Sequence, residues 1–109
     1  AEHVAVRLGR INRSSFAESQ LRAMDIERKT IIQATTFGIV PELLVGTRRI
    51  AIMHKRLAVH AARSLPITFS PLPFEFPPLV EGIQFHRSRI NDSGLKWLVE
   101  EIRAEVDRL

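Results

Sequence analysis

The sequence of 109 residues contains no cysteine and no tyrosine, and its apolar runs are short. The absence of cysteine excludes disulfide bonds, thiolate nucleophiles and zinc–thiolate centres, and it favours a reducing compartment. No run approaches the roughly 18 apolar residues that are needed to cross a bilayer. The opening stretch, AEHVAVRLGR, also lacks the pattern of a cleavable signal peptide. We therefore expect no membrane contact.

Catalytic motifs are missing as well. The five glycines form neither a phosphate-binding loop nor a dinucleotide fingerprint, and no serine lies within GxSxG. His54 and His60 are six residues apart, a spacing that does not align two ligands on one helical face, and no HExxH accompanies them. We predict no catalytic residues, no metal site and no cofactor, and hence no enzyme activity.

The charge balance is mildly basic, with 16 lysines and arginines against 12 acidic residues and a net charge of +4. The arginines come in scattered pairs, and the phenylalanines lie mostly in a proline-rich stretch. A nucleic-acid-binding surface would gather basic and aromatic residues on one face. The basic residues are therefore interpreted as a solvated surface.

The first part of the chain alternates between strand and helix patterns. Residues 3–8, HVAVRL, alternate in polarity and predict a half-buried strand. Its covered face consists of Val4, Val6 and Leu8. After a polar turn over residues 9–15, Ser15 and Glu18 have the spacing of a capping box, which predicts a helix over residues 16–24. The packed side of this helix is predicted to consist of Phe16, Leu21 and Met24.

A second strand is predicted over residues 29–36, KTIIQATT, which are rich in β-branched side chains. Thr36 then occupies an N-cap position, Pro41 falls in the first helical turn and Gly46 ends the helix. A short buried strand at residues 50–53 and a helix over residues 55–63 follow. This order predicts an α/β fold with a parallel or mixed sheet that is flanked by helices.

The composition then changes, because five of the six prolines lie between Pro66 and Pro78. Proline cannot donate to a sheet, so this segment is predicted to be an extended crossover. Residues 82–88, GIQFHRS, predict another strand, and Asn91 or Asp92 caps a last helix. The apolar stripe of that helix consists of Leu95, Leu98, Val99, Ile102 and Val106.

The segment ATTFGIVP connects the end of a predicted strand to the start of a predicted helix. In open α/β sheets, ligands bind outside the carboxyl ends of the strands, and the first amides of a helix attract anions. A carboxylate or phenolate could therefore be held by Thr35, Thr36, Phe37 and Gly38. The spacing alone favours the simpler interpretation, in which Thr36 caps the helix and Phe37 packs in the core.

Three segments, in this order, resemble the effector-binding domain of LysR-type transcriptional regulators: VPELLVGTRRIAIMHKRLA, LPITFSPLPFEFPPL and GIQFHRSRINDSGLKWLVEEI. In the third segment the recurring features are His86-Arg87, Asp92 and Trp97-Leu98. The resemblance extends from about His3 to Ile102, and PFEFPP and QFHRSR are closest to the nodulation regulators and other aromatic-responsive members.

This resemblance implies part of a periplasmic-binding-protein-like fold, with an effector cleft between two α/β subdomains. Residues 1–79 would form the C-terminal part of regulatory subdomain II, and residues 80–109 the returning strand and last helix of subdomain I. The cleft would be lined by Thr35, Thr36 and Phe37. Ile83 and Phe85 would supply a further wall, although ordinary sheet core is a competing interpretation for both.

As a regulator, the protein would sense a small, aromatic or carboxylate effector in the cytoplasm and form a homodimer or homotetramer. The winged helix-turn-helix of the family is absent from this chain, so DNA would be bound only through a missing N-terminal domain, with RNA polymerase as a further partner. One alternative is a fragment of a periplasmic-type solute-binding protein, which a signal peptide upstream would reveal. A small α/β enzyme is the weaker alternative.

Overall fold

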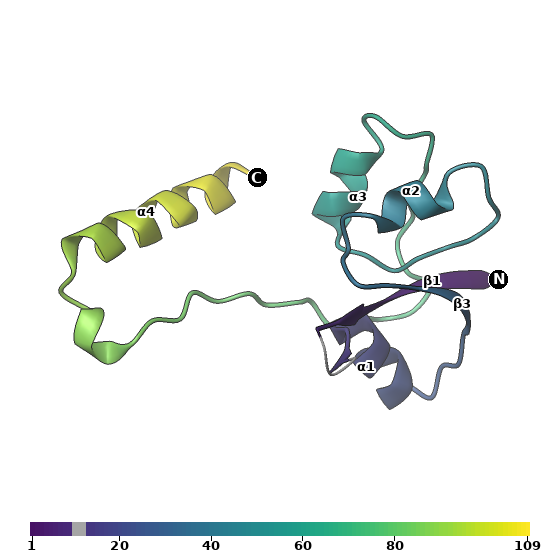
Figure 1. Cartoon of the computed structure of the whole chain (residues 1–109), viewed down its shortest axis with the longest axis horizontal. Helices are drawn as coiled ribbons and strands as arrows, with labels where there is room; N and C mark the ends of the chain where they lie inside the picture. Colours follow the sequence, from purple (N-terminus) through teal and green to yellow (C-terminus); the bar gives the residue numbers. More distant parts are fainter. Residues whose placement is uncertain (10–12) are drawn as a thin grey trace. The chain divides into compact units, whose positions relative to one another are not determined.

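The computed structural model describes residues 1–9 and 13–109, in two compact units, Ala1–Pro78 and Leu79–Leu109 (Figure 1). The division between the units falls after residue 78, one residue before the boundary predicted from the sequence. The match of each unit to a regulator subdomain stays a prediction. Part of the predicted turn over residues 9–15, namely residues 10–12, lies outside the described residues.

The first unit contains a three-stranded mixed sheet in the order β2-β1-β3. The strand β1 (Glu2–Leu8) runs parallel to β3 (Lys29–Ala34) and antiparallel to the short β2 (Arg13–Ser14). The β1–β3 ladder has one irregularity, because His3 pairs with Thr30 whereas its neighbour Val4 pairs with Ile32. The predicted α/β class with a mixed sheet is confirmed.

The central strand β1 is covered on both faces rather than on one. Val4, Ala5 and Val6 are all buried, and successive side chains of a strand point to opposite faces. Val4 and Val6 belong to the main core cluster with Ala34 and Val40. The helix α1 (Phe16–Ala23) lies on one side of the sheet and α2 (Val40–Leu44) on the other (Figure 1).

The half-buried pattern predicted for β1 is therefore wrong. Its third predicted core residue, Leu8, is 43% exposed because the strand ends there, beyond the last residue that pairs with β3. Being buried on both faces is typical of strands in a sheet that has helices on both sides.

The start of α1 follows the predicted cap. The Ser15 hydroxyl accepts a hydrogen bond from the Glu18 backbone N–H at 3.3 Å, while the Glu18 carboxylate pairs with Arg28 instead of completing a capping box. Leu21 is buried as predicted, but Met24 is 37% exposed. Met24 is the C-cap of α1, so it lies past the face that packs on the sheet.

The helix α1 ends in a turn whose left-handed residue is an aspartate and not the usual glycine. Asp25 has a positive φ of 55°. Its N–H donates to the Arg22 carbonyl at 3.1 Å, and the N–H of Ile26 donates to the Leu21 carbonyl at 2.9 Å. These two bonds form a Schellman motif, whose left-handed position is usually glycine.

The helix α2 begins later than predicted. The strand β3 ends at Ala34, and the N-cap of α2 is Ile39, which makes no side-chain capping bond. The prediction that Thr36 caps this helix is therefore wrong. Pro41 lies in the first turn as predicted, and Gly46, with a φ of 68°, follows the end of the helix.

The predicted strand at residues 50–53 is reduced to a single parallel bridge between Ile50 and His3. The N–H of Ile50 donates to the Glu2 carbonyl at 3.0 Å, and the Val4 N–H donates to the Ile50 carbonyl at 2.9 Å. Ile50 is 47% exposed, so the expected burial is wrong there. The chain leaves the sheet within a few residues to form α3 (Lys55–Ala61), which prevents a longer ladder.

The second unit contains a short 3₁₀ helix, η1 (Arg87–Arg89), and the long helix α4 (Ser93–Arg108). The predicted strand over residues 82–88 is wrong, because residues 82–86 form no helix or strand and no other strand lies in this unit to pair with them. As predicted, Asp92 caps α4, and its Oδ1 accepts from the Leu95 N–H at 2.9 Å. The predicted apolar stripe is present, but no residue of α4 is buried.

Candidate functional site

The parallel pairing of β1 gathers three segments at one edge of the sheet. β3 leads into residues 35–38, and the bridged segment that starts at Ile50 runs parallel to β1 on its other side and leads to His54. Because the carboxyl ends of parallel strands meet at the same edge, residues 35–38 lie beside the end of β1, and His54 joins them through its ring contact with Phe37. We call this region the carboxyl edge and define it as residues 6–8, 34–39 and 53–55.

The connections that leave this edge diverge. The chain after β1 leads by way of β2 to α1 on one face of the sheet, whereas the chain after β3 leads to α2 on the opposite face (Figure 1). In open α/β sheets, neighbouring strands whose connections leave toward opposite faces bound the crevice in which ligands bind. The topology therefore supports the carboxyl edge as the candidate site, independently of any helix cap.

The four residues predicted from ATTFGIVP all lie at this edge. Thr35, Thr36 and Gly38 are exposed, while Phe37 is partly buried and packs against the core cluster. The ring of Phe37 also meets the exposed ring of His54 edge to face, with centroids 6.1 Å apart and an interplanar angle of 78°. Phe37 thus serves the core, as the simpler interpretation expected, and contacts a polar ring at the edge.

The predicted anion contact through the amides of Phe37 and Gly38 stays a prediction. The helix α2 has only five residues, and the N–H of its first residue, Val40, already donates to the Phe37 carbonyl at 3.2 Å. Sequence reasoning missed His54, which was examined only for its spacing to His60. The local pattern at residues 50–53 predicts a strand but not its place beside β1, so it does not indicate the contact of His54 with Phe37.

The two other predicted residues, Ile83 and Phe85, belong to the second unit, where they are 45% and 42% exposed. They lie in a segment without strand partners, so the competing interpretation as sheet core is wrong. Thr35–Gly38 belong to the first unit, and the place of Ile83 and Phe85 in a cleft stays a prediction.

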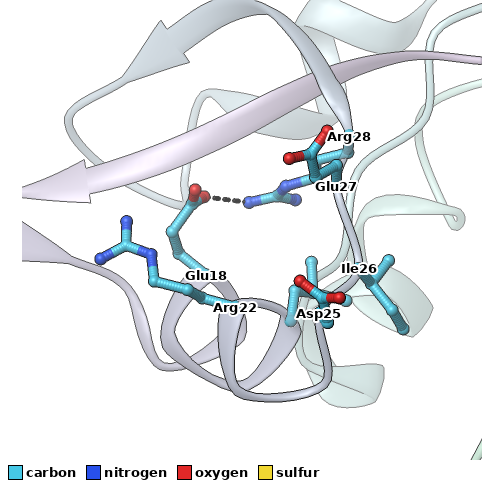
Figure 2. Close-up of a pocket in the computed structure, with 7 residues that line it drawn as sticks. Glu18, Arg22, Asp25, Ile26, Glu27 and Arg28 are labelled. Atoms are coloured by element: carbon cyan, nitrogen blue, oxygen red, sulfur yellow. Dashed lines mark hydrogen bonds and ion pairs between the residues drawn. The ribbon is translucent and has the colours of Figure 1, made fainter.

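A pocket of about 320 Å³ lies at the opposite end of the sheet, where α1 ends and β3 is about to begin (Figure 2). None of its lining residues was predicted as a site residue. They are Glu18, Leu21, Arg22, Asp25, Ile26, Glu27 and Arg28.

The polar centre of this pocket is an ion pair between Glu18 and Arg28, whose side chains are 19% and 7% exposed. Within the described residues, Arg28 Nε and His3 Nδ1 are buried without a hydrogen-bond partner. Burial, together with the Arg28 charge, lowers the pKa of His3 below its usual 6.5. Because the Arg28 charge is already matched by Glu18, we interpret this site as a structural link between α1 and β3.

Other kinds of site have no support in the described ranges. Residues 1–9 and 13–109 include no group of three or more histidine, aspartate or glutamate side chains that could hold a metal ion. Among the same residues, no helix combines the length and apolar character that a membrane crossing requires.

The fold thus defines a small α/β unit, with the carboxyl edge as its candidate site. No protein-family model matches the chain, and no solved structure matches it. The periplasmic-binding-protein-like arrangement accordingly stays a prediction.

The chain is, however, similar to curated proteins named nodulation protein D. It is 33% identical to nodulation protein D 2 of Rhizobium tropici over 104 residues, which cover 95% of this chain and 33% of that protein. It is 32% identical to nodulation protein D 2 of Bradyrhizobium elkanii over 107 residues, 98% of this chain and 32% of that protein. For nodulation protein D 1 of Mesorhizobium japonicum the identity is 31% over 107 residues, 98% and 34% of the two chains.

The chain thus spans about a third of the length of these relatives. The resemblance to nodulation regulators is confirmed as similarity to proteins of that name. The part of a regulator to which the chain corresponds stays a prediction.

Proposed function

We propose that this chain is the effector-sensing and oligomerising part of a LysR-type transcriptional regulator. The observation that carries the proposal is the similarity to proteins named nodulation protein D, which extends over 95–98% of the chain. The order of the three resembling segments in the sequence agrees with this similarity. In the full-length protein, residues 1–79 would belong to regulatory subdomain II and residues 80–109 to subdomain I, and DNA would be bound by a separate N-terminal domain.

The effector site of the proposal is the carboxyl edge, with Thr35, Thr36, Phe37 and Gly38 as contacts. Phe37 offers an apolar ring and the threonines offer hydroxyls, a mixture typical of small-molecule sites. The described residues of this edge include no acidic side chain, whereas Arg7 and Lys55 are basic. This composition favours an aromatic molecule that carries an acidic group. Ile83, Phe85 and residues outside this chain would supply the other wall of the cleft.

The proposed mechanism is a population shift. An effector that binds one arrangement of the cleft better than another biases the oligomer toward that arrangement, and the oligomer positions the DNA-binding heads. A tenfold difference in affinity between two arrangements corresponds to about 1.4 kcal/mol of coupling free energy. The effector therefore needs only modest selectivity to change the DNA footprint several-fold.

The test uses the full-length protein and apigenin, a hydroxylated flavone. We expect apigenin to raise the unfolding temperature and to change the DNA footprint. Phe37→Ala should weaken apigenin binding at least about tenfold, because truncating a phenylalanine removes roughly 1.5–3 kcal/mol of apolar burial. Thr36→Val should weaken binding, whereas the control Thr68→Val, at an exposed position in the proline-rich crossover, should not. A wild-type protein that responds in neither assay would overturn the proposal.

A further inference from the structure

We propose that the exposed basic face of α3 is a second DNA-contacting surface, which holds the phosphate backbone of the duplex that flanks the regulator's DNA site. The basic face consists of Arg56, His60 and Arg63. The inference goes beyond the proposed function, in which a separate N-terminal domain binds DNA, and it rests on that function for the presence of DNA. Phosphate contacts carry no sequence information of their own.

The positive charge of the chain is concentrated in one segment. Residues 43–74 contain five lysines and arginines and no aspartate or glutamate. The other 77 residues hold the remaining 11 basic residues and all 12 acidic ones, a net charge of −1 against +4 for the whole chain. The segment therefore supplies the entire excess of positive charge, although its basic residues form only short groups along the sequence.

The helix α3 presents part of this charge on one side. Ala58 and Ala61 are buried, whereas Arg56, His60 and Arg63 are exposed. The three exposed residues follow the i, i+4, i+7 spacing of a single helical face. Arg63 continues this spacing beyond the end of α3, because its N–H donates to the His60 carbonyl at 3.2 Å. The helix lies on the same side of the sheet as α2 and opposite α1 (Figure 1).

The fold makes no use of these charges. Among the ion pairs of the described residues, none includes a residue of α3 or Arg63. Arg56 lies in the first turn of α3, where there is no acidic residue and where a positive charge is unfavourable to the helix. The charge of Arg56 therefore costs stability instead of adding to it, which favours a negatively charged partner outside the chain.

The composition of the basic face favours phosphate groups over a protein surface. No large apolar side chain of α3 is exposed, whereas protein interfaces are built around apolar and aromatic side chains. A phosphate backbone is bound by basic side chains and other hydrogen-bond donors. From Arg56 to Arg63 the helix advances roughly 10 Å. This length matches about three phosphates of one DNA strand, which follow each other at about 3.4 Å along the axis.

The experiment compares two duplexes that are bound by the full-length protein. Both contain the same DNA site, which is selected with that protein from a random library. The short duplex ends at the edges of the footprint, and the long duplex continues for about three helical turns on each side. Fluorescence anisotropy at several salt concentrations measures the affinity for each. We expect the wild type to bind the long duplex more tightly and with a steeper dependence on salt.

The test variant combines Arg56→Gln with Arg63→Gln. On the long duplex it should reduce the slope of log affinity against log salt by about 1.8 or more, because each lost phosphate contact removes about 0.9. Over a fourfold rise in salt concentration, this difference corresponds to a roughly twelvefold smaller loss of affinity than in the wild type. On the short duplex the variant and the wild type should bind alike.

The matched control combines Lys96→Gln with Arg103→Gln. Both residues are exposed on α4 and seven positions apart, as Arg56 and Arg63 are, and their replacement removes the same charge. Acidic residues lie between them, so we expect no loss of binding on either duplex. Unfolding temperatures close to that of the wild type verify that the variants are folded.

The outcomes separate this proposal from the proposed function. A wild-type salt slope of the α3 variant on the long duplex would overturn the DNA contact and leave the proposed function standing. An equal change in the α4 control would overturn it too, because net charge and not the basic face would be the cause. A wild-type slope with lost activation in reconstituted transcription would assign the face to an acidic protein instead. If the full-length protein selects no DNA site, both proposals fail.

Discussion

Asp25 adopts the left-handed backbone conformation that closes the Schellman motif after α1. This conformation costs an ordinary L-residue roughly 1–2 kcal/mol, although aspartate tolerates it better than most residues. The carboxylate also lies at the carboxyl end of a helix, where negative charge is unfavourable. The residue therefore weakens a motif whose hydrogen bonds are otherwise complete.

We predict that Asp25→Gly raises the free energy of unfolding of the first unit by about 0.5–1 kcal/mol. Asp25→Ala is the matched control, because it removes the charge but not the backbone cost, and it should stabilise less than glycine. Urea denaturation of both variants measures the difference. An alanine variant as stable as the glycine variant would show that the charge, and not the backbone, is the cause.

His3 is a second residue whose surroundings affect stability, in this case through pH. Burial and the nearby Arg28 charge lower its pKa from the usual 6.5. The unfolded chain therefore binds a proton at a higher pH than the folded chain does, so stability rises with pH in this range. The contribution of neutral His3 is fully present above about pH 6.5 and is lost progressively as the pH falls toward the lowered pKa.

We expect the unfolding free energy of the wild type to decrease between pH 7.5 and pH 5.5, and the decrease to be smaller in His3→Gln, which cannot be protonated. Urea denaturation at several pH values checks this. The exposed His60 provides the control, since His60→Gln should keep the wild-type pH dependence. An identical pH slope in the wild type and in His3→Gln would contradict the prediction.

At the scale of elements, the ion pair between Glu18 and Arg28 connects the middle of α1 to the residue that precedes β3. Both side chains are largely buried, so neither charge is easily solvated if its partner is removed. The exposed pair of Glu2 and Lys29, 3.3 Å apart, connects the starts of β1 and β3 in the same unit. The two pairs allow a direct comparison of buried and exposed charges.

We predict that Glu18→Ala destabilises the first unit by about 3 kcal/mol or more, because it leaves Arg28 buried without its counter-charge. Glu2→Ala should cost less than about 1 kcal/mol, since an exposed pair is screened by water. Chemical denaturation with circular dichroism detection measures both. Similar losses in the two variants would show that burial of the pair has no energetic consequence.

The elements also show which features a sequence can predict. Ser15, Pro41, Gly46 and Asp92 act within a few residues of their own positions, and the local patterns placed each of them correctly. Residues 50–53 and 82–88 were predicted as strands from the local sequence alone. A strand also needs a partner over several residues, and that requirement is set by distant parts of the chain.

The candidate site likewise has a part that the sequence predicted and a part that it could not predict. The carboxyl-end rule identified residues 35–38 from the order of elements, although the supporting idea of a capped helix at Thr36 was wrong. The contact between Phe37 and His54 could not be predicted, because it joins residues from two sides of β1. Sequence order alone does not say on which side of a central strand the next segment will lie.

At the scale of the whole molecule, the two units differ in how much they bury. The first unit contains all the buried residues of the described chain, including Val4, Leu21, Val40 and Ala58. In the second unit, Leu98 and Val106 of α4 remain 47% and 46% exposed. Helices of this length are marginal in water without an apolar face that is covered.

We therefore expect amide hydrogen exchange in the 109-residue chain to be much faster in α4 than in β1 and β3. Core elements open only with the free energy of global unfolding, whereas elements without buried contacts open locally. Mass spectrometry of exchange in the peptides of each element checks this. Protection of α4 equal to that of β1 would contradict the prediction.

The offset in the β1–β3 ladder has a consequence for how the chain tolerates length changes. Thr30 opposes His3 and Ile32 opposes Val4, so Ile31 is a surplus residue that no partner requires. A chain from which Ile31 is deleted would keep Ile32 and Ala34 facing the core, whereas deletion of Gln33 would turn one of them outward. We therefore expect the strand to tolerate the loss of one residue at position 31, because the register with β1 is kept, but not at position 33, because the alternation of buried side chains is broken.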